Sequence, residues 1–145
     1  MNEILKIPFA AFNNDWDALQ KFLERRGYPP YMITGDLSLV NSKVKSLGNL
    51  TSVGGNLDLR YSGIESLGNL TSVGGYLDLI KGEIESFGNL KSVGSWLDLE
   101  YSKIKDLGNL TSVGGHLYLT DTPLSKKYSE EEIRSMVEVG RSIYF

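Results

Sequence analysis

The chain has 145 residues, of which 41% are hydrophobic and 23% are charged, close to the average for a globular domain, so we expect one folded domain. The formal net charge of -3 gives no broad electropositive field, which argues against binding nucleic acid through its phosphates. The sequence contains no cysteine, which excludes disulfides and thiolate metal sites.

The start of the chain, from Met1 to Pro8, has neither the basic stretch nor the long apolar stretch of a secretory signal. No apolar run in the sequence approaches the length that crosses a membrane. Absence of cysteine also fits a reducing compartment. These features predict a cytoplasmic protein with no membrane partner.

An N-terminal cap is predicted over residues 1–31. Asn13 or Asn14 is expected to cap a helix from Asp15 to Arg26, which is acidic at its start and basic at its end. The side chains that follow helical spacing, and that we expect to pack on the rest of the domain, are Trp16, Leu19, Phe22 and Leu23.

A repeat with a period of twenty residues occupies residues 32–124. The decapeptide from Leu50 to Leu59 returns from Leu70, Leu90 and Leu110, and a weaker first copy precedes it. One coil has too few apolar groups to bury them alone, so neighbouring coils must stack to form a core. The sequence therefore predicts a mostly β solenoid of about five 20-residue coils, with one parallel sheet and a capping helix at each end.

Positions within one coil indicate how it is built. Leu57 and Leu59 alternate as in a strand, while the later spacings of three residues predict an irregular return path. The Gly54-Gly55 pair predicts a corner, where either a positive φ or close contact between coils requires glycine. A recurring asparagine is expected to point inward and satisfy buried backbone groups. Its copies are Asn49, Asn69, Asn89 and Asn109.

The pattern Leu57-x-Leu59-x-x-Ser62-x-Ile64-x-x-Leu67 resembles the leucine-rich-repeat consensus L-x-L-x-x-N-x-L, in a variety similar to internalin-type or receptor-L-domain-like bacterial repeats. The resemblance covers residues 33–124. The family's asparagine is replaced here in every coil, by Ser42, Ser62, Gly82, Ser102 and Thr122. The resemblance implies a parallel sheet on a concave face that binds protein, and it implies no catalytic residues.

A C-terminal cap is predicted over residues 125–145. Ser129 and Glu132 form the pattern of a capping box, which indicates the start of a helix with an apolar stripe. The stripe consists of Ile133, Met136 and Val137. The tail from Arg141 to Phe145 is expected to fold back as an edge strand, and a small docking peptide is the alternative.

Positions that face outward from the strands and differ between coils are where recognition could be encoded. Tyr76, Trp96 and His116 are expected to stack as an exposed column. A second column is expected from Asp58, Asp78 and Asp98. These carboxylates either bind a basic partner or a cation, or they recur only because the repeat was duplicated. The candidate partner-binding residues are Tyr76, Trp96, His116, Tyr118, Asp58, Asp78, Asp98, Arg60, Ile80 and Glu100. The alternative is that the aromatic side chains simply cover the sheet or contact the tail.

The predicted function is non-enzymatic binding of another protein. By analogy with small repeat proteins of bacteria and phages, the chain is expected to inhibit its target or to act as an adaptor for it. Two alternatives stay open. One is a structural or assembly component that self-associates, as in a virion. The other is a carbohydrate-binding module that stacks sugars on Tyr76 and Trp96. We expect no cofactor and no metal, because one column of carboxylates offers too few oxygen ligands for calcium. We also expect no catalysis, because no motif places a nucleophile and a base beside His116, the single histidine.

Overall fold

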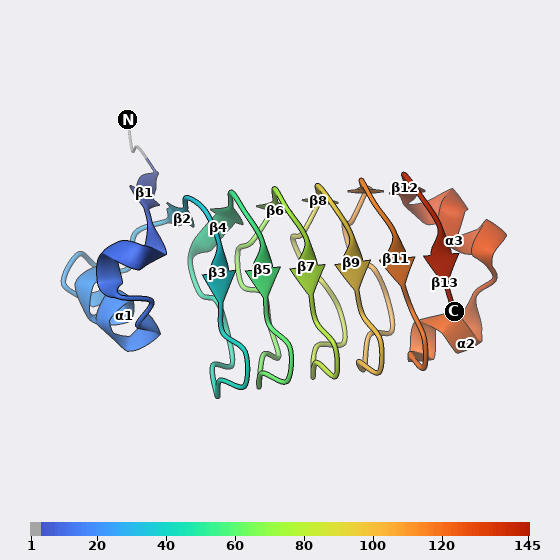
Figure 1. Ribbon diagram of the computed structural model, residues 1–145, viewed down its shortest axis with the longest axis horizontal. Coiled ribbons are helices and arrows are strands. Elements are labelled where there is room, and N and C mark those ends of the chain that lie inside the picture. Colours follow the sequence, from blue (N-terminus) through green and yellow to red (C-terminus); the bar gives the residue numbers. More distant parts are fainter. Residues whose placement is uncertain (1–3) are drawn as a thin grey trace.

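The alternating leucines of each coil form a strand, and the coils stack as a parallel β-solenoid with short helices at its ends (Figure 1). The fold class predicted from the repeat is therefore confirmed. The computed structural model describes residues 4–145; residues 1–3 of the predicted N-terminal cap lie outside the described part. The leucine strands build sheet B, in the order β13-β11-β9-β7-β5-β3. Its strands are β3 (Leu37–Ser38), β5 (Leu57–Asp58), β7 (Leu77–Asp78), β9 (Leu97–Asp98), β11 (Leu117–Tyr118) and β13 (Ile143–Tyr144).

A second parallel sheet, sheet A, occupies the part of each coil that was predicted to be an irregular return. Its order is β1-β2-β4-β6-β8-β10-β12. Only two residues per coil are extended in most of these strands, too few to show alternation in the sequence, and pairing to the same position of the next coil stabilises them. The strands are β1 (Leu5–Ile7), β2 (Tyr31–Ile33), β4 (Leu50–Val53), β6 (Ser72–Val73), β8 (Ser92–Val93), β10 (Ser112–Val113) and β12 (Glu138–Val139).

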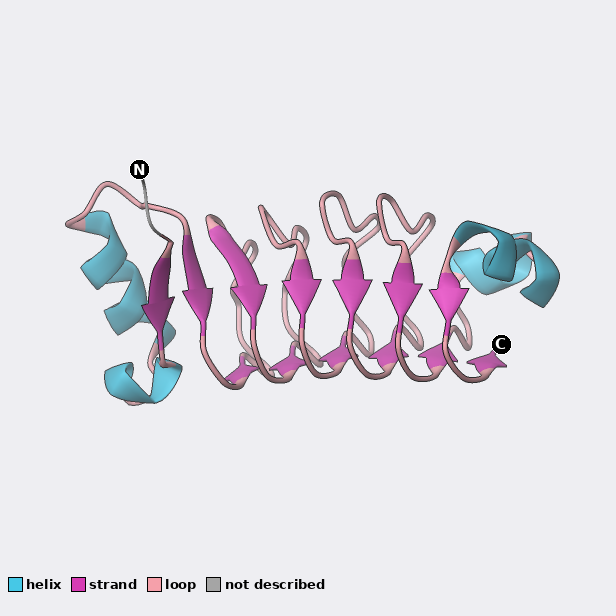
Figure 2. Cartoon of the chain, turned by 90° about the horizontal axis from the view of Figure 1, so that it is seen from above, coloured by secondary structure: helices cyan, strands magenta, loops and turns pink. Residues whose placement is uncertain are grey.

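The coils stack in an almost straight row, seen with sheet B facing the viewer in Figure 1 and with sheet A facing the viewer in Figure 2. Because both sides of each coil are strands, both sides advance by one strand spacing, about 4.8 Å, per coil. Neither side is wider than the other, so a strongly concave sheet face does not form. The expectation of a concave recognition face is therefore not met.

The core lies between the two sheets and consists of the repeated apolar side chains. In one coil Leu57, Leu59, Ile64 and Leu70 are fully buried, and their equivalents in the next coils are buried in the same way. Burial of each such side chain stabilises the fold by roughly 1.5–3 kcal/mol relative to exposure. The period of twenty therefore builds one continuous core rather than a series of separate ones.

The Gly-Gly corner is explained by close approach of adjacent coils. A Cβ atom on Gly94 would overlap the carbonyl oxygen of Gly74, and Gly114 meets Gly94 in the same way. Positive φ angles occur instead at another repeated glycine, as at Gly68 (φ 59°) and Gly88 (φ 60°). Of the two reasons predicted for the Gly-Gly corner, close contact is therefore the one that applies.

The asparagine ladder does form, but it lies on the surface, so the prediction of an inward ladder is wrong. Asn69, Asn89 and Asn109 are exposed, and Asn69 Nδ2 donates to Asn49 Oδ1 at 2.9 Å. Two of the asparagines do satisfy backbone groups, as predicted, because Asn49 Nδ2 donates to the carbonyl of Tyr28 and Asn109 Nδ2 donates to the carbonyl of Gly88. The asparagines therefore connect coils along the outside of the bend.

The N-terminal cap combines a strand, a short 3-10 helix and an α-helix. Strand β1 pairs with β2 and extends sheet A; η1 (Phe9–Phe12) and α1 (Trp16–Glu24) then cover the first coil. Asp15 caps α1 by accepting from the amide of Ala18, which corrects the prediction of Asn13 or Asn14. Those asparagines have φ angles of 54° and 56°, a left-handed conformation that asparagine tolerates.

The C-terminal cap contains one unpredicted helix and one predicted helix. Helix α2 (Pro123–Lys127) is capped by Thr122, and α3 (Glu130–Met136) begins with the predicted capping box of Ser129 and Glu132. Strand β12 then joins sheet A and β13 joins sheet B, so the tail packs as an edge strand. Met136 departs from the predicted apolar stripe, because its side chain is 44% exposed.

Candidate functional site

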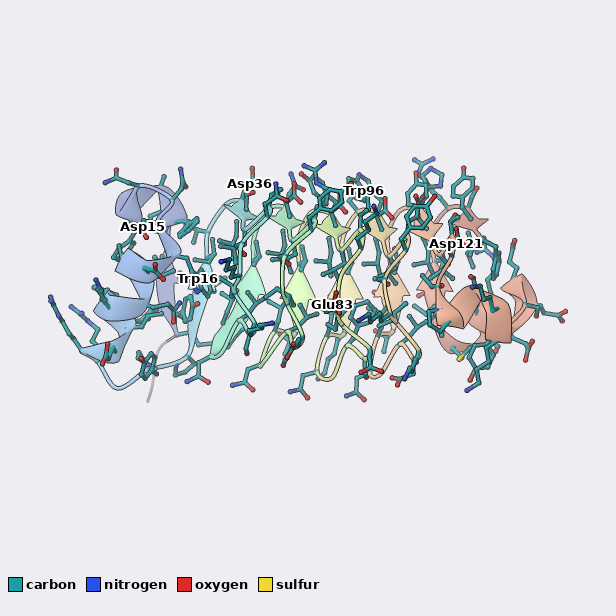
Figure 3. All side chains as sticks on the ribbon, turned by 90° about the horizontal axis from the view of Figure 1, so that it is seen from below. Asp15, Trp16, Asp36, Glu83, Trp96 and Asp121 are labelled. Carbon is teal, nitrogen blue, oxygen red and sulfur yellow. The ribbon has the colours of Figure 1, made fainter. Side chains whose placement is uncertain are left out.

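The outer face of sheet B brings most of the predicted partner-binding residues together. Because the leucines at 57 and 59 and their equivalents point inward, the residues between and beside them point away from the core. Figure 3 shows Asp36 and Trp96 along one edge of the molecule, whereas Glu83 lies nearer the middle of that view. We call this surface the outer face; its rows follow the strands from β3 to β13.

An aromatic cluster covers the C-terminal half of the outer face. Tyr76 and Trp96 stack with ring centroids 4.1 Å apart and planes inclined by 5°. Tyr118 meets Trp96 edge to face at 6.5 Å and stacks on Tyr144 at 5.0 Å. Aromatic pairs in such geometries contribute about 0.5–1.5 kcal/mol beyond their buried area. The cluster is therefore a packed aromatic surface in which Tyr76 and Trp96 are half-buried, not fully exposed as predicted.

The predicted column of Tyr76, Trp96 and His116 is interrupted after Trp96. His116 contacts Tyr118 and Tyr144, at 6.0 and 5.6 Å between ring centroids, and its Nδ1 accepts a hydrogen bond from the amide of Ser142. The C-terminal strand draws the imidazole toward the tail and away from Trp96. Part of the alternative prediction, contact between the aromatic side chains and the tail, is therefore realised at His116.

The aspartate column has a structural role in every coil that carries it. Oδ1 of Asp58, Asp78 and Asp98 accepts the backbone amide two residues ahead, at 3.2, 3.1 and 3.0 Å. Asparagine and aspartate commonly stabilise turns in this way. These bonds explain why the residue recurs. The second carboxylate oxygen of each side chain takes no part in them.

Arg60 forms ion pairs with the first two aspartates of the column. Its Nε and Nη2 donate to the two oxygens of Asp58 at 2.9 and 2.8 Å, and its Nε lies 3.5 Å from Oδ2 of Asp78. Asp58 and Asp78 are only 8% and 5% exposed, so they depend on this cation. Burial, more than the neighbouring Asp58, raises the pKa of Asp78 above its usual value.

Asp98 has no ion-pair partner among residues 4–145. Burial, and then the negative charges of Glu100 and Asp78, raises the pKa of Asp98 to about 6. Glu100 lies on the same row, and Ile80 occupies its equivalent in the previous coil. The outer face carries five carboxylates and one guanidinium group, that of Arg60. The outer face therefore has an excess of negative charge beside the aromatic cluster. The carboxylates belong to Asp36, Asp58, Asp78, Asp98 and Glu100.

Two features near this face were not found from the sequence. Tyr144, 45% exposed, extends the aromatic cluster, and only the register of β13 on β11 places it there. Tyr61, Lys81 and Tyr101 have φ angles of 54°, 57° and 60° at the turn after each strand. The signal for that conformation was present in the sequence, because Asn41 and Asp121 occupy the same position in the outermost coils and favour it.

In comparisons with known proteins, no family model, no curated protein and no solved structure matches this chain. The fold and the outer face therefore provide the basis for a functional proposal. Within residues 4–145, no group of three or more His, Asp or Glu side chains is arranged to hold a metal ion. No helix in the same range is both long enough and apolar enough to cross a bilayer.

Proposed function

We propose that this chain is a non-enzymatic protein-binding module of the leucine-rich-repeat kind, and that its outer face binds an arginine- or lysine-containing segment of another protein. The twenty-residue coils and the periodic leucines support the assignment to that kind of repeat. The observation that carries the binding proposal is the position of the Tyr76 and Trp96 stack beside the unpaired carboxylate of Asp98.

Aromatic and carboxylate groups bind a cationic side chain in complementary ways. The face of a tryptophan or tyrosine ring attracts an ammonium or guanidinium group, and a neighbouring carboxylate forms a charge-assisted hydrogen bond with it. Arg60 already occupies Asp58 and Asp78, so a partner cation is expected at Asp98 and Glu100. Rings that are already stacked lose little conformational freedom on binding, which favours affinity.

Selection from a random peptide display library tests the proposal. Wild-type protein is the bait, and the Trp96→Ala/Asp98→Asn variant removes peptides that bind elsewhere. We expect the surviving peptides to share arginine or lysine and to lose binding in high salt, because exposed charge interactions are screened. Enrichment of acidic peptides, or of none, would contradict the proposal.

A further inference from the structure

A second candidate site lies at the other end of the molecule, between helix α1 and the first coil. Among residues 4–145 only three buried side-chain polar atoms have no hydrogen-bond partner: Gln20 Nε2, Tyr31 Oη and Ser42 Oγ. All three belong to residues that line the two cavities at this junction. Buried polar atoms are nearly always paired in proteins, so three unpaired ones at a single junction require an explanation.

The first cavity, about 540 Å³, opens beside the start of α1, where Figure 3 labels Asp15 and Trp16. Its lining residues include Trp16, Gln20, Leu39 and Ser42. Two carboxylates, from Asp15 and Asp17, and two ammonium groups, from Lys43 and Lys45, also line it and leave its net charge at zero. The lining therefore has no net charge that would favour an anion or a cation.

The second cavity, about 330 Å³, adjoins the first at Gln20, which lines both. Leu23, Tyr28, Pro29 and Tyr31 give it a mainly apolar wall. Both volumes fall within the range of small-molecule sites, about 300–1,000 Å³. A ligand at this junction would contact the apolar wall, and it would reach the three buried polar atoms only after the side chains that shield them move.

Among the three residues, Tyr31 is the most deeply buried, and its hydroxyl has a raised pKa. Its side chain is 1% exposed, and burial raises its pKa to about 12, an effect that the nearby Gln20 amide partly offsets. The Gln20 side chain lowers this pKa through a weak hydrogen bond to the hydroxyl, and that contact falls short of full hydrogen-bonding geometry for the Tyr31 hydroxyl and for the Gln20 amide nitrogen. Rotation of the flexible Gln20 side chain is the simplest movement that would open both atoms to a ligand.

We propose that this junction binds a small neutral ligand with several hydroxyl groups on an apolar ring, the chemistry of a neutral mono- or disaccharide. Hydroxyl groups both donate and accept, which matches a set of one amide donor and two hydroxyls. The ring would pack on Trp16 and the apolar wall, and the lining has no net charge that would favour a phosphorylated or otherwise charged ligand. This site is separate from the outer face and from the partner proposed there.

The test is a titration of ¹⁵N-labelled protein with glucose, N-acetylglucosamine and maltose, with glucose 6-phosphate as the charged comparison. We expect at least one neutral sugar to shift the Gln20 side-chain amide and the backbone amides of residues 42–46 in a saturable way. The Tyr31→Phe and Ser42→Ala variants should each weaken that affinity about fivefold, as expected for loss of one hydrogen bond. Tyr61→Phe, at an exposed turn in another coil, is the matched control and should bind normally.

Thermal unfolding of the same variants separates a ligand site from a structural one. Because the Tyr31 hydroxyl has no fully formed hydrogen bond in the folded protein, Tyr31→Phe should leave Tm unchanged or raise it while affinity falls. A lower Tm with unchanged affinity would show a purely structural hydroxyl and would overturn the proposal. So would the absence of any saturable shift with all three neutral sugars at millimolar concentrations, or a stronger response to glucose 6-phosphate.

Discussion

The rings of Tyr76 and Trp96 lie face to face across neighbouring coils, with centroids 4.1 Å apart, on strands whose register pairs Leu77 with Leu97. The solenoid itself sets this geometry, because equivalent positions of adjacent coils are one strand spacing apart. Any partner that docks on the outer face therefore meets two rings whose positions are already set, with one face of each ring covered by the other.

Replacing the platform should abolish binding and preserve the fold. In the Tyr76→Ala/Trp96→Ala variant we expect binding of a selected basic peptide to be lost, because central interface anchors contribute about 2 kcal/mol or more each. Both side chains lie outside the leucine core, so circular dichroism should be unchanged. Tyr61→Ala, which removes an exposed tyrosine elsewhere, is the control. Unchanged affinity in the double variant would move the binding site away from the outer face.

Asp98→Asn should stabilise the protein near neutral pH. The folded-state pKa of about 6 lies above the ordinary value of 3.8, so the folded protein binds this proton more tightly than the unfolded chain. The wild type therefore loses stability as pH rises from about 4 to about 6, by about 1–2 kcal/mol after allowing for solvent contact. Urea melts across this range should show that loss in the wild type and a flatter profile in the variant. Parallel profiles would contradict the assignment.

Two glycines of the repeat should respond differently to alanine. Gly94→Ala places a methyl group against the carbonyl oxygen of Gly74, so we expect a loss of about 2–4 kcal/mol or failure to fold. In Gly88→Ala the new Cβ has no atom within 4 Å. The only cost is that alanine must adopt a positive φ of 60°, which destabilises the fold by about 1 kcal/mol. The comparison is made by denaturant melts. Equal losses would show that coil contact is not what requires glycine at position 94.

Tyr101→Asn should raise stability. Tyr101 holds a left-handed conformation and is 50% exposed, so it gains little from packing while its backbone is strained. Asparagine tolerates this conformation, as Asn41 does at the equivalent position, so we expect a gain of about 0.5–1 kcal/mol. Lys91→Ala, at an exposed position of the preceding coil, shows the effect of an unrelated surface change. A destabilised Tyr101→Asn protein would mean that the ring makes contacts that matter.

The period of twenty was sufficient to predict the solenoid and its leucine strands, and the apolar residues of the tail predicted its edge strand. The repeat pattern could not reveal sheet A, because two extended residues per coil are too few to show an alternation of apolar and polar side chains. It also misplaced the asparagines. Their recurrence and their bonds to backbone carbonyls were predicted, as Asn49 and Asn109 show, but these bonds are made from the surface of the bend and not from its interior.

The candidate site was predicted less completely than the fold. Outward positions such as Tyr76 and Trp96 follow from alternation alone, and their stacking is confirmed. The displacement of His116 and the addition of Tyr144 depend on how the tail registers with β11, which no repeat encodes. Asp98 and Arg60 were both identified, and the repeat places them two coils apart, but only the structure shows that the Arg60 guanidinium pairs with Asp58 and Asp78.

The most direct test of the outer face uses Trp96 as its own reporter. The chain has two tryptophans, so Trp16→Phe leaves Trp96 as the sole one. We predict a saturable change in its fluorescence on titration with an arginine-glycine peptide, a change that salt weakens and that the added Asp98→Asn/Glu100→Gln substitutions abolish. No change with the arginine peptide, or the same change with a peptide carrying glutamate in place of arginine, would contradict the account.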